Sequence, residues 1–196
     1  MSLEHFFKPQ SVAIVGASRS PGKVGYEILA GLQKAGFEGK IFAVNPAADE
    51  ILGLPVYTDL KSIGESPELA ILVISAKHVP KAMQDCADLG VKAVLIVASG
   101  FKESGPEGAE LEKKVIHIAK RAGIRIIGPN CIGLMVPAYK LNASFGGDLP
   151  AAGSVGYFSQ SGSLLAAIVD MARDTRLGFS KLVSIGNKAD VNELTM

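Results

Sequence analysis

Short apolar runs recur along the first two thirds of the chain, separated by longer stretches with helical spacing. The apolar runs are nearly continuous instead of alternating with polar residues, which is typical of parallel β-strands covered on both faces. We predict five such strands: Ser11–Ala17, Lys40–Asn45, Leu69–Ser75, Ala93–Ser99 and Arg125–Gly128.

Helical stretches lie between these strands, and we predict helices at Lys23–Ala35, Pro80–Leu89 and Pro106–Ala122. A glycine directly follows each of them, which is a common helix stop signal. Strands that alternate with helices indicate right-handed βαβ units. We therefore expect an α/β fold, with a Rossmann-like doubly wound parallel sheet over residues 1–128.

The composition changes after Gly128: Pro129–Pro150 is rich in Gly, Pro and Asn, and we predict that it is mostly loop. We predict a second α/β unit over residues 129–196, because strand-like and helix-like segments alternate again after this loop. Its two strands are too few for a sheet buried on both sides, so we expect the chain to stop inside its second domain, as a fragment or as part of a longer protein. The elements predicted there are strand Ser154–Phe158, helix Ser163–Arg173, strand Leu182–Ile185 and the start of a helix at Asp190–Met196.

Composition narrows the possible functions. The chain is 48% apolar and 20% charged, with a net charge of +1. This balance lacks the basic excess of nucleic-acid or anionic-membrane binders, and no apolar run reaches the roughly 18 residues of a membrane span. The polar N-terminus does not resemble a secretory signal, and two cysteines without a CxxC pair favour the cytoplasm. His5, His78 and His117 are scattered, so we expect no metal site.

The loop after the first predicted strand, Gly16–Gly25, carries three glycines together with Arg19 and Lys23. Ligands of doubly wound folds bind at the carboxyl ends of the strands. Glycines let the backbone approach a phosphate, and the following helix directs its free amides and positive dipole end at the anion. A phosphate-bearing ligand is therefore favoured over a tight turn without a ligand.

Two common phosphate-binding patterns fit this loop poorly. A Walker A loop requires Ser or Thr after its lysine, but Val24 follows Lys23. A dinucleotide fingerprint requires GxGxxG and an acidic residue at the end of the second strand, where this chain has Asn45-Pro46. An NAD(P)-dependent oxidoreductase is therefore the weaker alternative.

Five motifs, in order, carry a resemblance to a known family: VGAS…PGKVG (residues 15–25), VNP (44–46), ASGFKE (98–103), GPNCIGLMVP (128–137) and GSVGYFSQSGSL (153–164). Together they resemble the α subunit, the CoA-binding half, of ADP-forming acetyl-CoA synthetases. These are relatives of the succinyl-CoA synthetase α subunit in the NDP-forming acyl-CoA synthetase family. The resemblance implies that the second domain is flavodoxin-like.

The resemblance also implies which residues bind coenzyme A. All lie in loops at predicted strand ends, and most have small side chains that expose backbone amides. They are Gly16, Ala17, Ser18, Pro21, Gly22, Lys23, Asn45, Pro46, Ser75, Ala76, Ala98, Ser99 and Gly100.

In the second domain, the resemblance implies a phosphate site at Ser161, Gly162 and Asn130, where the phosphate of a phosphohistidine is received. Unpaired amides at a helix N-terminus suit this role, although Ser161 could instead only cap the helix. Cys131 is not expected to be catalytic, because no histidine lies near it in the sequence.

The implied reaction is acyl-CoA + ADP + phosphate ⇌ acid + CoA + ATP, through an acyl phosphate and a phosphohistidine. The resemblance places that histidine beyond residue 196, so we expect no catalytic residue in this chain. ATP or ADP and Mg²⁺ are expected only on an ATP-grasp β half, separate or fused, and the other partner is a small carboxylic acid or its acyl phosphate.

Two departures from the family pattern concern substrate contacts. Ala48 stands where succinyl-CoA synthetases have a lysine, so CoA must be held differently there. Ala166 stands where they have a substrate-contacting tyrosine, which argues against succinate. The remaining alternative is a CoA-sensing regulatory domain of a protein acetyltransferase, which shares the first-domain motifs.

Overall fold

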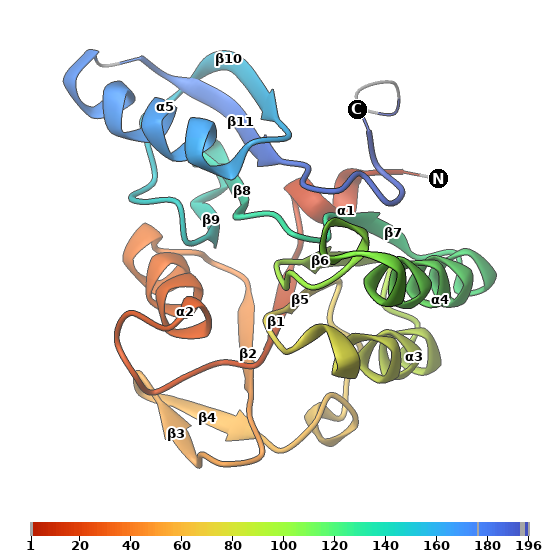
Figure 1. The fold of residues 1–196 in the computed structure, drawn as a ribbon. Helices are drawn as coiled ribbons and strands as arrows, with labels where there is room; N and C mark the ends of the chain where they lie inside the picture. Colours follow the sequence, from red (N-terminus) through yellow and green to blue (C-terminus); the bar gives the residue numbers. More distant parts are fainter. Residues whose placement is uncertain (1, 176, 193–194, 196) are drawn as a thin grey trace.

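The computed structural model of the protein describes residues 2–175, 177–192 and 195, and it contains two β-sheets (Figure 1). In the described part of the chain, the first sheet has seven strands in the order β3-β4-β2-β1-β5-β6-β7. All neighbouring pairs are parallel except β3 and β4. The strands are β1 Ser11–Val15, β2 Lys40–Val44, β3 Glu50–Ile51, β4 Leu54–Tyr57, β5 Leu69–Leu72, β6 Ala93–Ile96 and β7 Arg125–Ile127.

The predicted doubly wound α/β fold is confirmed, with α2 (Val24–Ala35), α3 (Val79–Leu89) and α4 (Pro106–Ala122) between the strands. Each helix ends at a glycine in the left-handed conformation, which a residue without Cβ adopts at little cost. The short helix α1 (Glu4–Phe7) and the β3–β4 hairpin were not predicted. Both are too short to produce a periodic pattern.

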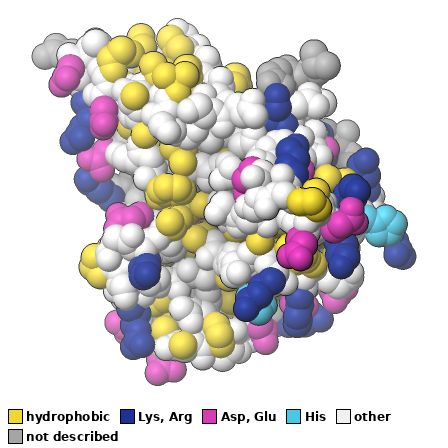
Figure 2. Space-filling model, in the orientation of Figure 1, with side chains coloured by type: hydrophobic (Ala, Val, Ile, Leu, Met, Phe, Trp, Pro, Cys, Tyr) yellow, Lys and Arg dark blue, Asp and Glu magenta, His cyan; other side chains and the backbone are white. Residues whose placement is uncertain are grey.

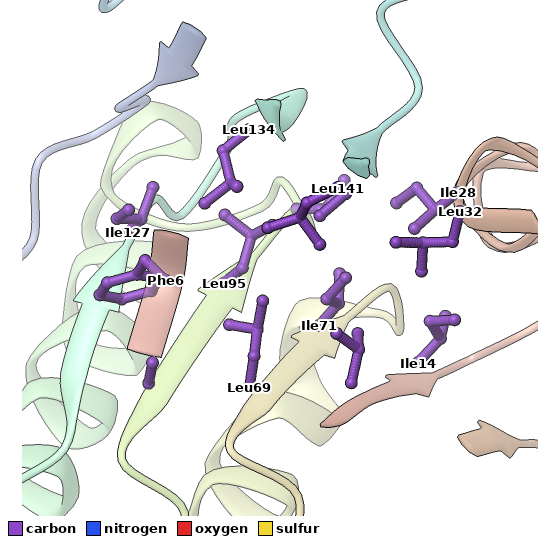
Figure 3. Packing of buried hydrophobic residues seen from close by; sticks show 14 of the residues in the cluster. Phe6, Ile14, Ile28, Leu32, Leu69, Ile71, Leu95, Ile127, Leu134 and Leu141 are labelled. Atoms are coloured by element: carbon purple, nitrogen blue, oxygen red, sulfur yellow. The ribbon is translucent and has the colours of Figure 1, made fainter. Parts of the chain in front are cut away.

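Alternate residues of the central strands divide the core between the two faces of the first sheet. Ala13, Ala70 and Val94 point to the face covered by α3 and α4. Ile14, Ile71 and Leu95 point to the other face, where they meet side chains of α1 and α2 (Figure 3). Continuous apolar strands follow from this arrangement, because both faces are buried.

The second sheet is antiparallel at one edge and parallel at the other. Its described strands run in the order β10-β11-β8-β9, with β8 (Gly133–Val136), β9 (Leu141–Ser144), β10 (Ala152–Ser159) and β11 (Phe179–Ser184). Helix α5 (Gly162–Thr175) packs on it through Leu165 and Val169. Exposed hydrophobic side chains gather over the upper part of the molecule, where α5 lies, and they include Leu164 and Met171 (Figure 2).

Most of Pro129–Pro150 lies outside strands, as predicted, but the prediction missed β8 and β9, which lie within this segment. Leu134 from β8 and Leu141 from β9 are fully buried against the first sheet and α2 (Figure 3). Their burial explains why two four-residue strands are stable among turn-forming residues. This sheet, with four strands instead of the expected two, shares its core with the first one.

The segment after β11 runs back along the free edge of β7. The amide of Asn187 donates to the carbonyl of Pro129 at 2.8 Å, that of Ala189 to Gly128 at 3.0 Å and that of Val191 to Ile126 at 3.1 Å. The predicted helix start at Asp190–Met196 is therefore wrong for residues 190–192, which are not helical. Residues 193, 194 and 196 of that prediction lie outside the described part.

Candidate functional site: a cleft between the two sheets

A cleft of about 930 Å³ opens between the carboxyl ends of the first sheet's central strands and the start of α5. Parallel strands bring their following loops to the same edge, so loops far apart in sequence meet there. The link between the two sheets contributes Asn130 to Ile132 to the cleft wall. The cleft is thus built by both halves of the chain.

Close backbone packing shapes the first loop. A Cβ built on Gly25 would lie 2.1 Å from the carbonyl oxygen of Gly16, and one on Gly16 would lie 2.6 Å from the carbonyl oxygen of Val73. Only glycine allows the start of α2 to approach the end of β1 so closely. The two glycines therefore bring the helix N-terminus to the floor of the cleft.

Unpaired backbone amides gather at this point. Within the described residues, the amides of Ser18, Val24 and Gly25 have no acceptor, whereas that of Gly22 donates to the carboxylate of Glu27 at 2.8 Å. The side chain of Lys23 has no carboxylate partner in the same set. Free amides at a helix N-terminus beside an unpaired ammonium suit a phosphate or pyrophosphate group.

Asn45 holds two loops together. Its Nδ2 donates to the carbonyl of Ala17 at 2.7 Å, and its Oδ1 accepts the amide of Ala47 at 2.8 Å. An aspartate here would bring a carboxylate against the carbonyl of Ala17. The residue is therefore an asparagine for a structural reason, and the carboxylate that clasps a dinucleotide ribose has no place at this strand end.

The start of α5 forms the opposite wall of the cleft. Ser161 caps the helix, since its Oγ accepts the amide of Leu164 at 3.3 Å. In the described part of the chain, the amides of Gly162 and Ser163 have no acceptor, and both residues line the cleft. The capping role of Ser161 thus coexists with free amides that can receive an anion.

Asn130 lies between the two walls. Its amide donates to the carbonyl of Ala98 at 2.9 Å, which ties the link between the sheets to the end of β6. Its side chain is exposed, and no hydrogen-bond partner for it occurs among the described residues. The Asn130 carboxamide is therefore available to a ligand in the cleft.

The loop after β6 is fixed by Glu103, whose Oε1 accepts the amides of Gly100 at 2.6 Å and Phe101 at 3.1 Å. Asn187, next to β11, donates its Nδ2 to Glu103 and, at 3.0 Å, to Glu112. Burial raises the pKa of Glu103, but the hydrogen bonds from Asn187 and from these amides outweigh it and hold the pKa below its ordinary value. We call Lys102, Glu103, Glu112 and Asn187 the inter-sheet latch.

Cys131 is 4% exposed, and its thiol donates to the carbonyl of Ile96 at 3.3 Å. Burial raises the pKa of this thiol to about 12, so it is protonated at neutral pH. A protonated, hydrogen-bonded thiol is a poor nucleophile. The expectation that Cys131 has no catalytic role stays a prediction, and the burial of the thiol is one reason for it.

Most of the residues predicted to bind ligand come together. Those that line the cleft are Gly16, Ala17, Ser18, Lys23, Asn45, Ser75, Ala98, Ser99, Asn130, Ser161 and Gly162. Pro21, Gly22, Ala76 and Gly100 do not line it, and the amide of Gly100 is already bound to Glu103. Sequence reasoning missed Gly25, Ile132 and Phe145; the close packing of Gly25 was signalled by its place in the glycine loop.

Pro46 lines a second cavity of about 460 Å³, which adjoins the first. The two cavities share Gly16, Asn45 and Ile74. The walls of the second cavity are largely apolar, with Val15, Val44 and Leu60 among them, and its lining also includes Asp59, His78, Lys81 and Asp85. A flat apolar group of a ligand could therefore lie here while its phosphates occupy the first cavity.

Among the residues that the structure describes, no group of three His, Cys, Asp or Glu side chains is arranged to hold a metal ion. No helix in this part of the chain combines the length and the apolar character needed to cross a membrane.

The fold and the cleft define an α/β protein whose strand ends form a cleft suited to a phosphate-bearing ligand, and comparison with known proteins identifies the family. Residues 10–137 match the CoA binding domain family, and the chain belongs to it. Residues 152–196 match the succinyl-CoA ligase like flavodoxin domain. The resemblance inferred from the motifs is confirmed.

Similar proteins are longer than this chain. The ADP-forming acetate–CoA ligase of Methanocaldococcus jannaschii is 47% identical over 191 residues, which are 97% of this chain and 27% of that protein. The α subunit of ADP-forming acetate–CoA ligase I of Pyrococcus furiosus is 41% identical over 197 residues, 98% of this chain and 43% of that subunit.

Among solved structures, a similar one is the dinucleotide forming acetyl-coenzyme A synthetase 1 of Ca. Korarchaeum cryptofilum in complex with phosphate and ADP. It has a TM-score of 0.94 and 37% identity, and the match covers 99% of this chain and 41% of that one. The chain thus spans less than half the length of these relatives.

Proposed function

We propose that this chain is the CoA-binding portion of an NDP-forming acid–CoA ligase. The observation that carries the proposal is the cleft between the sheets, in which free amides at the starts of two helices, α2 and α5, face one ligand space. One set of amides suits the pyrophosphate of CoA, and the other suits a transferred phosphate. The kinship with ADP-forming acetate–CoA ligases supports the same assignment.

In this proposal CoA spans both cavities. The pyrophosphate binds the amides of Ser18, Val24 and Gly25 and the ammonium of Lys23. The adenine lies in the apolar second cavity, beyond Asn45, and the pantetheine arm crosses the ends of β5 and β6 toward the second sheet. Small side chains at Ser75, Ala98 and Ser99 leave room for that arm.

The thiol end of CoA would then lie near the start of α5. Here the amides of Gly162 and Ser163, with the Asn130 carboxamide, stabilise the negative charge of a phosphate on an acyl phosphate. The residues of this chain bind and orient both groups, so that the CoA thiol can attack the acyl carbon and release phosphate. In the opposite direction, phosphate at this site would attack the acyl carbon of acyl-CoA and release the CoA thiol, and the acyl phosphate so formed would transfer its phosphoryl group to a histidine outside this chain and release the acid.

The complete reaction, acyl-CoA + ADP + phosphate ⇌ acid + CoA + ATP, requires further parts. We propose that an ATP-grasp β half, fused or separate, supplies the nucleotide and Mg²⁺ site, since relatives are named as α subunits. The acid is a small carboxylic acid. The 196-residue chain alone is expected to bind CoA but not to catalyse the synthesis.

Isothermal titration with CoA tests the binding part. We expect saturable binding at micromolar concentration and no heat with NADH, because Asn45 leaves no carboxylate for a dinucleotide ribose. The Gln84→Ala variant, altered on the exposed face of α3, serves as control and should bind like the unmodified chain. A folded sample that ignores CoA, or that prefers NADH, refutes the proposal.

A CoA-sensing domain would bind CoA too, so the phosphate site separates the two possibilities. A ligase needs an anion site at the start of α5, and a sensor does not. Inorganic phosphate should therefore shift the backbone NMR signals of Gly162 and Ser163 in the CoA-bound chain. Unmoved signals at millimolar phosphate would favour the sensor.

A further inference from the structure

The second cavity and the junction between the cavities differ in charge. Lys81 in the lining of the second cavity is paired with Asp85 at 2.9 Å, Lys61 lies 3.4 Å from the same carboxylate, and Asp59 and His78 also line this cavity. Charged lining in the first cavity consists of Lys23. The lysine in the lining of the second cavity is therefore already engaged by a carboxylate, so this cavity offers a phosphate monoester no unpaired lysine.

Arg19 lines neither cavity, but it directly follows Ser18, which lines the first one. It belongs to the first loop, yet its Nη2 donates to the carbonyl of Ala47, after β2, at 3.3 Å. Asn45 fixes the same turn by accepting the Ala47 amide. This contact places the guanidinium next to Ala47, one residue before Ala48. Ala48 is the position at which the sequence offers no cation to hold CoA.

The guanidinium of Arg19 keeps unused donors. The side chain is exposed, and no carboxylate pairs with it in the described part of the chain. Guanidinium has five N–H donors in a planar fork that matches phosphate oxygens. One arm anchored on Ala47 leaves the others free for a bidentate contact.

We propose that Arg19 recognises the 3′-phosphate of the CoA ribose and makes the site specific for CoA over ligands without that phosphate. This inference rests on the proposed function. A ligand with adenine in the second cavity and pyrophosphate in the first has its ribose at the junction lined by Gly16, Asn45 and Ile74. Arg19 follows Ser18 of the first cavity and is bonded to Ala47, which follows Pro46 of the second, so the guanidinium is placed to supply the charge that Ala48 cannot.

The test is a cycle of two ligands and two variants, measured by isothermal titration. The ligands are CoA and 3′-dephospho-CoA, and the variants are Arg19→Gln and Lys23→Gln. We expect the unmodified chain to prefer CoA by about 10-fold, the size of one exposed charge-assisted contact. Arg19→Gln should lower the preference to about 1 by weakening only CoA. Lys23→Gln should weaken both ligands by the same factor.

Two further variants sharpen the reading. Lys92→Gln removes one charge at the opposite edge of the sheet, before β6, and should leave the preference unchanged. Arg19→Lys should keep part of it. An Arg19→Gln chain that retains the preference, or loses both ligands equally, overturns the inference while the proposed function stands. If the unmodified chain binds neither ligand, the proposed function fails and the inference fails with it.

Discussion

Replacing Asn187 should reveal how strongly the inter-sheet latch holds the two sheets together. Asn187 is 7% exposed, and its Nδ2 serves two carboxylates, Glu103 and Glu112. Asn187→Ala leaves both acceptors without this donor, and Lys102, 3.3 Å from Glu112, remains as the only cation of the latch. Hydrogen bonds to charged groups contribute about 1.5–3 kcal/mol each, so we expect a loss of about 3 kcal/mol.

For a chain of this size, that loss corresponds to a decrease in Tm of about 6–12 °C. Thermal unfolding followed by circular dichroism measures it. Gln84→Ala is the matched control, because the Gln84 amide also donates to a carboxylate, Asp88, at 2.8 Å, but on an exposed helix face. The control should move Tm by less than about 2 °C. Equal decreases in the two variants would refute the reasoning.

Asn187→Asp keeps the volume but replaces the Nδ2 donor with a negatively charged acceptor. It places a third carboxylate beside Glu103 and Glu112, so repulsion raises the pKa values in the group. The variant should be less stable than Asn187→Ala at pH 7, and the difference should shrink as the pH falls toward about 5, where a carboxyl takes up a proton. A difference independent of pH would contradict this account.

Three other predictions concern the cleft. Gly25→Ala should abolish CoA binding in a titration, because its Cβ would lie 2.1 Å from a backbone oxygen. The Cβ of Gly22→Ala meets nothing within 4 Å, so this variant should lower the free energy of unfolding in urea by only about 1–2 kcal/mol, the cost of a left-handed φ. Cys131 and Cys86, with pKa values raised to about 12 by burial, should ignore Ellman's reagent at pH 8 until urea unfolds the chain; rapid labelling of the native chain would contradict their burial. The pKa of Glu103 is lowered from 4.5, so the stability that its carboxylate contributes should be present above that pH and lost as the pH falls below it. Glu103→Gln removes this titration, so Tm should fall less steeply at acidic pH in the variant than in the unmodified chain.

Much of the fold was predictable from the sequence, because a strand buried on both faces leaves an unmistakable apolar run. Val12 to Ile14 and Leu69 to Leu72 are such runs. Strands β8 and β9 were not predictable on the same grounds. Leu134 and Leu141 are buried only because a second sheet packs on the first, and a short apolar run among glycines and prolines does not signal that long-range contact.

The candidate site was also predictable only in part. The glycine loop could be predicted, because its spaced glycines indicate a close approach of backbone segments. The role of Asn45 as a brace between Ala17 and Ala47 could not be read from the chain, because it depends on two loops that meet in space. The same holds for Glu103, which takes the Gly100 amide that sequence reasoning reserved for a ligand. The boundary at residue 128 between the two domains stays a prediction.

The strand-like return of residues 187–191 along β7 makes the first sheet a poor candidate for excision. A fragment that ends at Gly128 would leave the carbonyls of Ile126 and Gly128 without their hydrogen-bond donors and would expose the edge strand β7. It would also lack Leu134 and Leu141 and so expose apolar side chains beside α2. Exposed edge strands pair with other chains and promote aggregation. Engineers who want a minimal CoA-binding module should therefore keep the return segment, or graft a substitute for it.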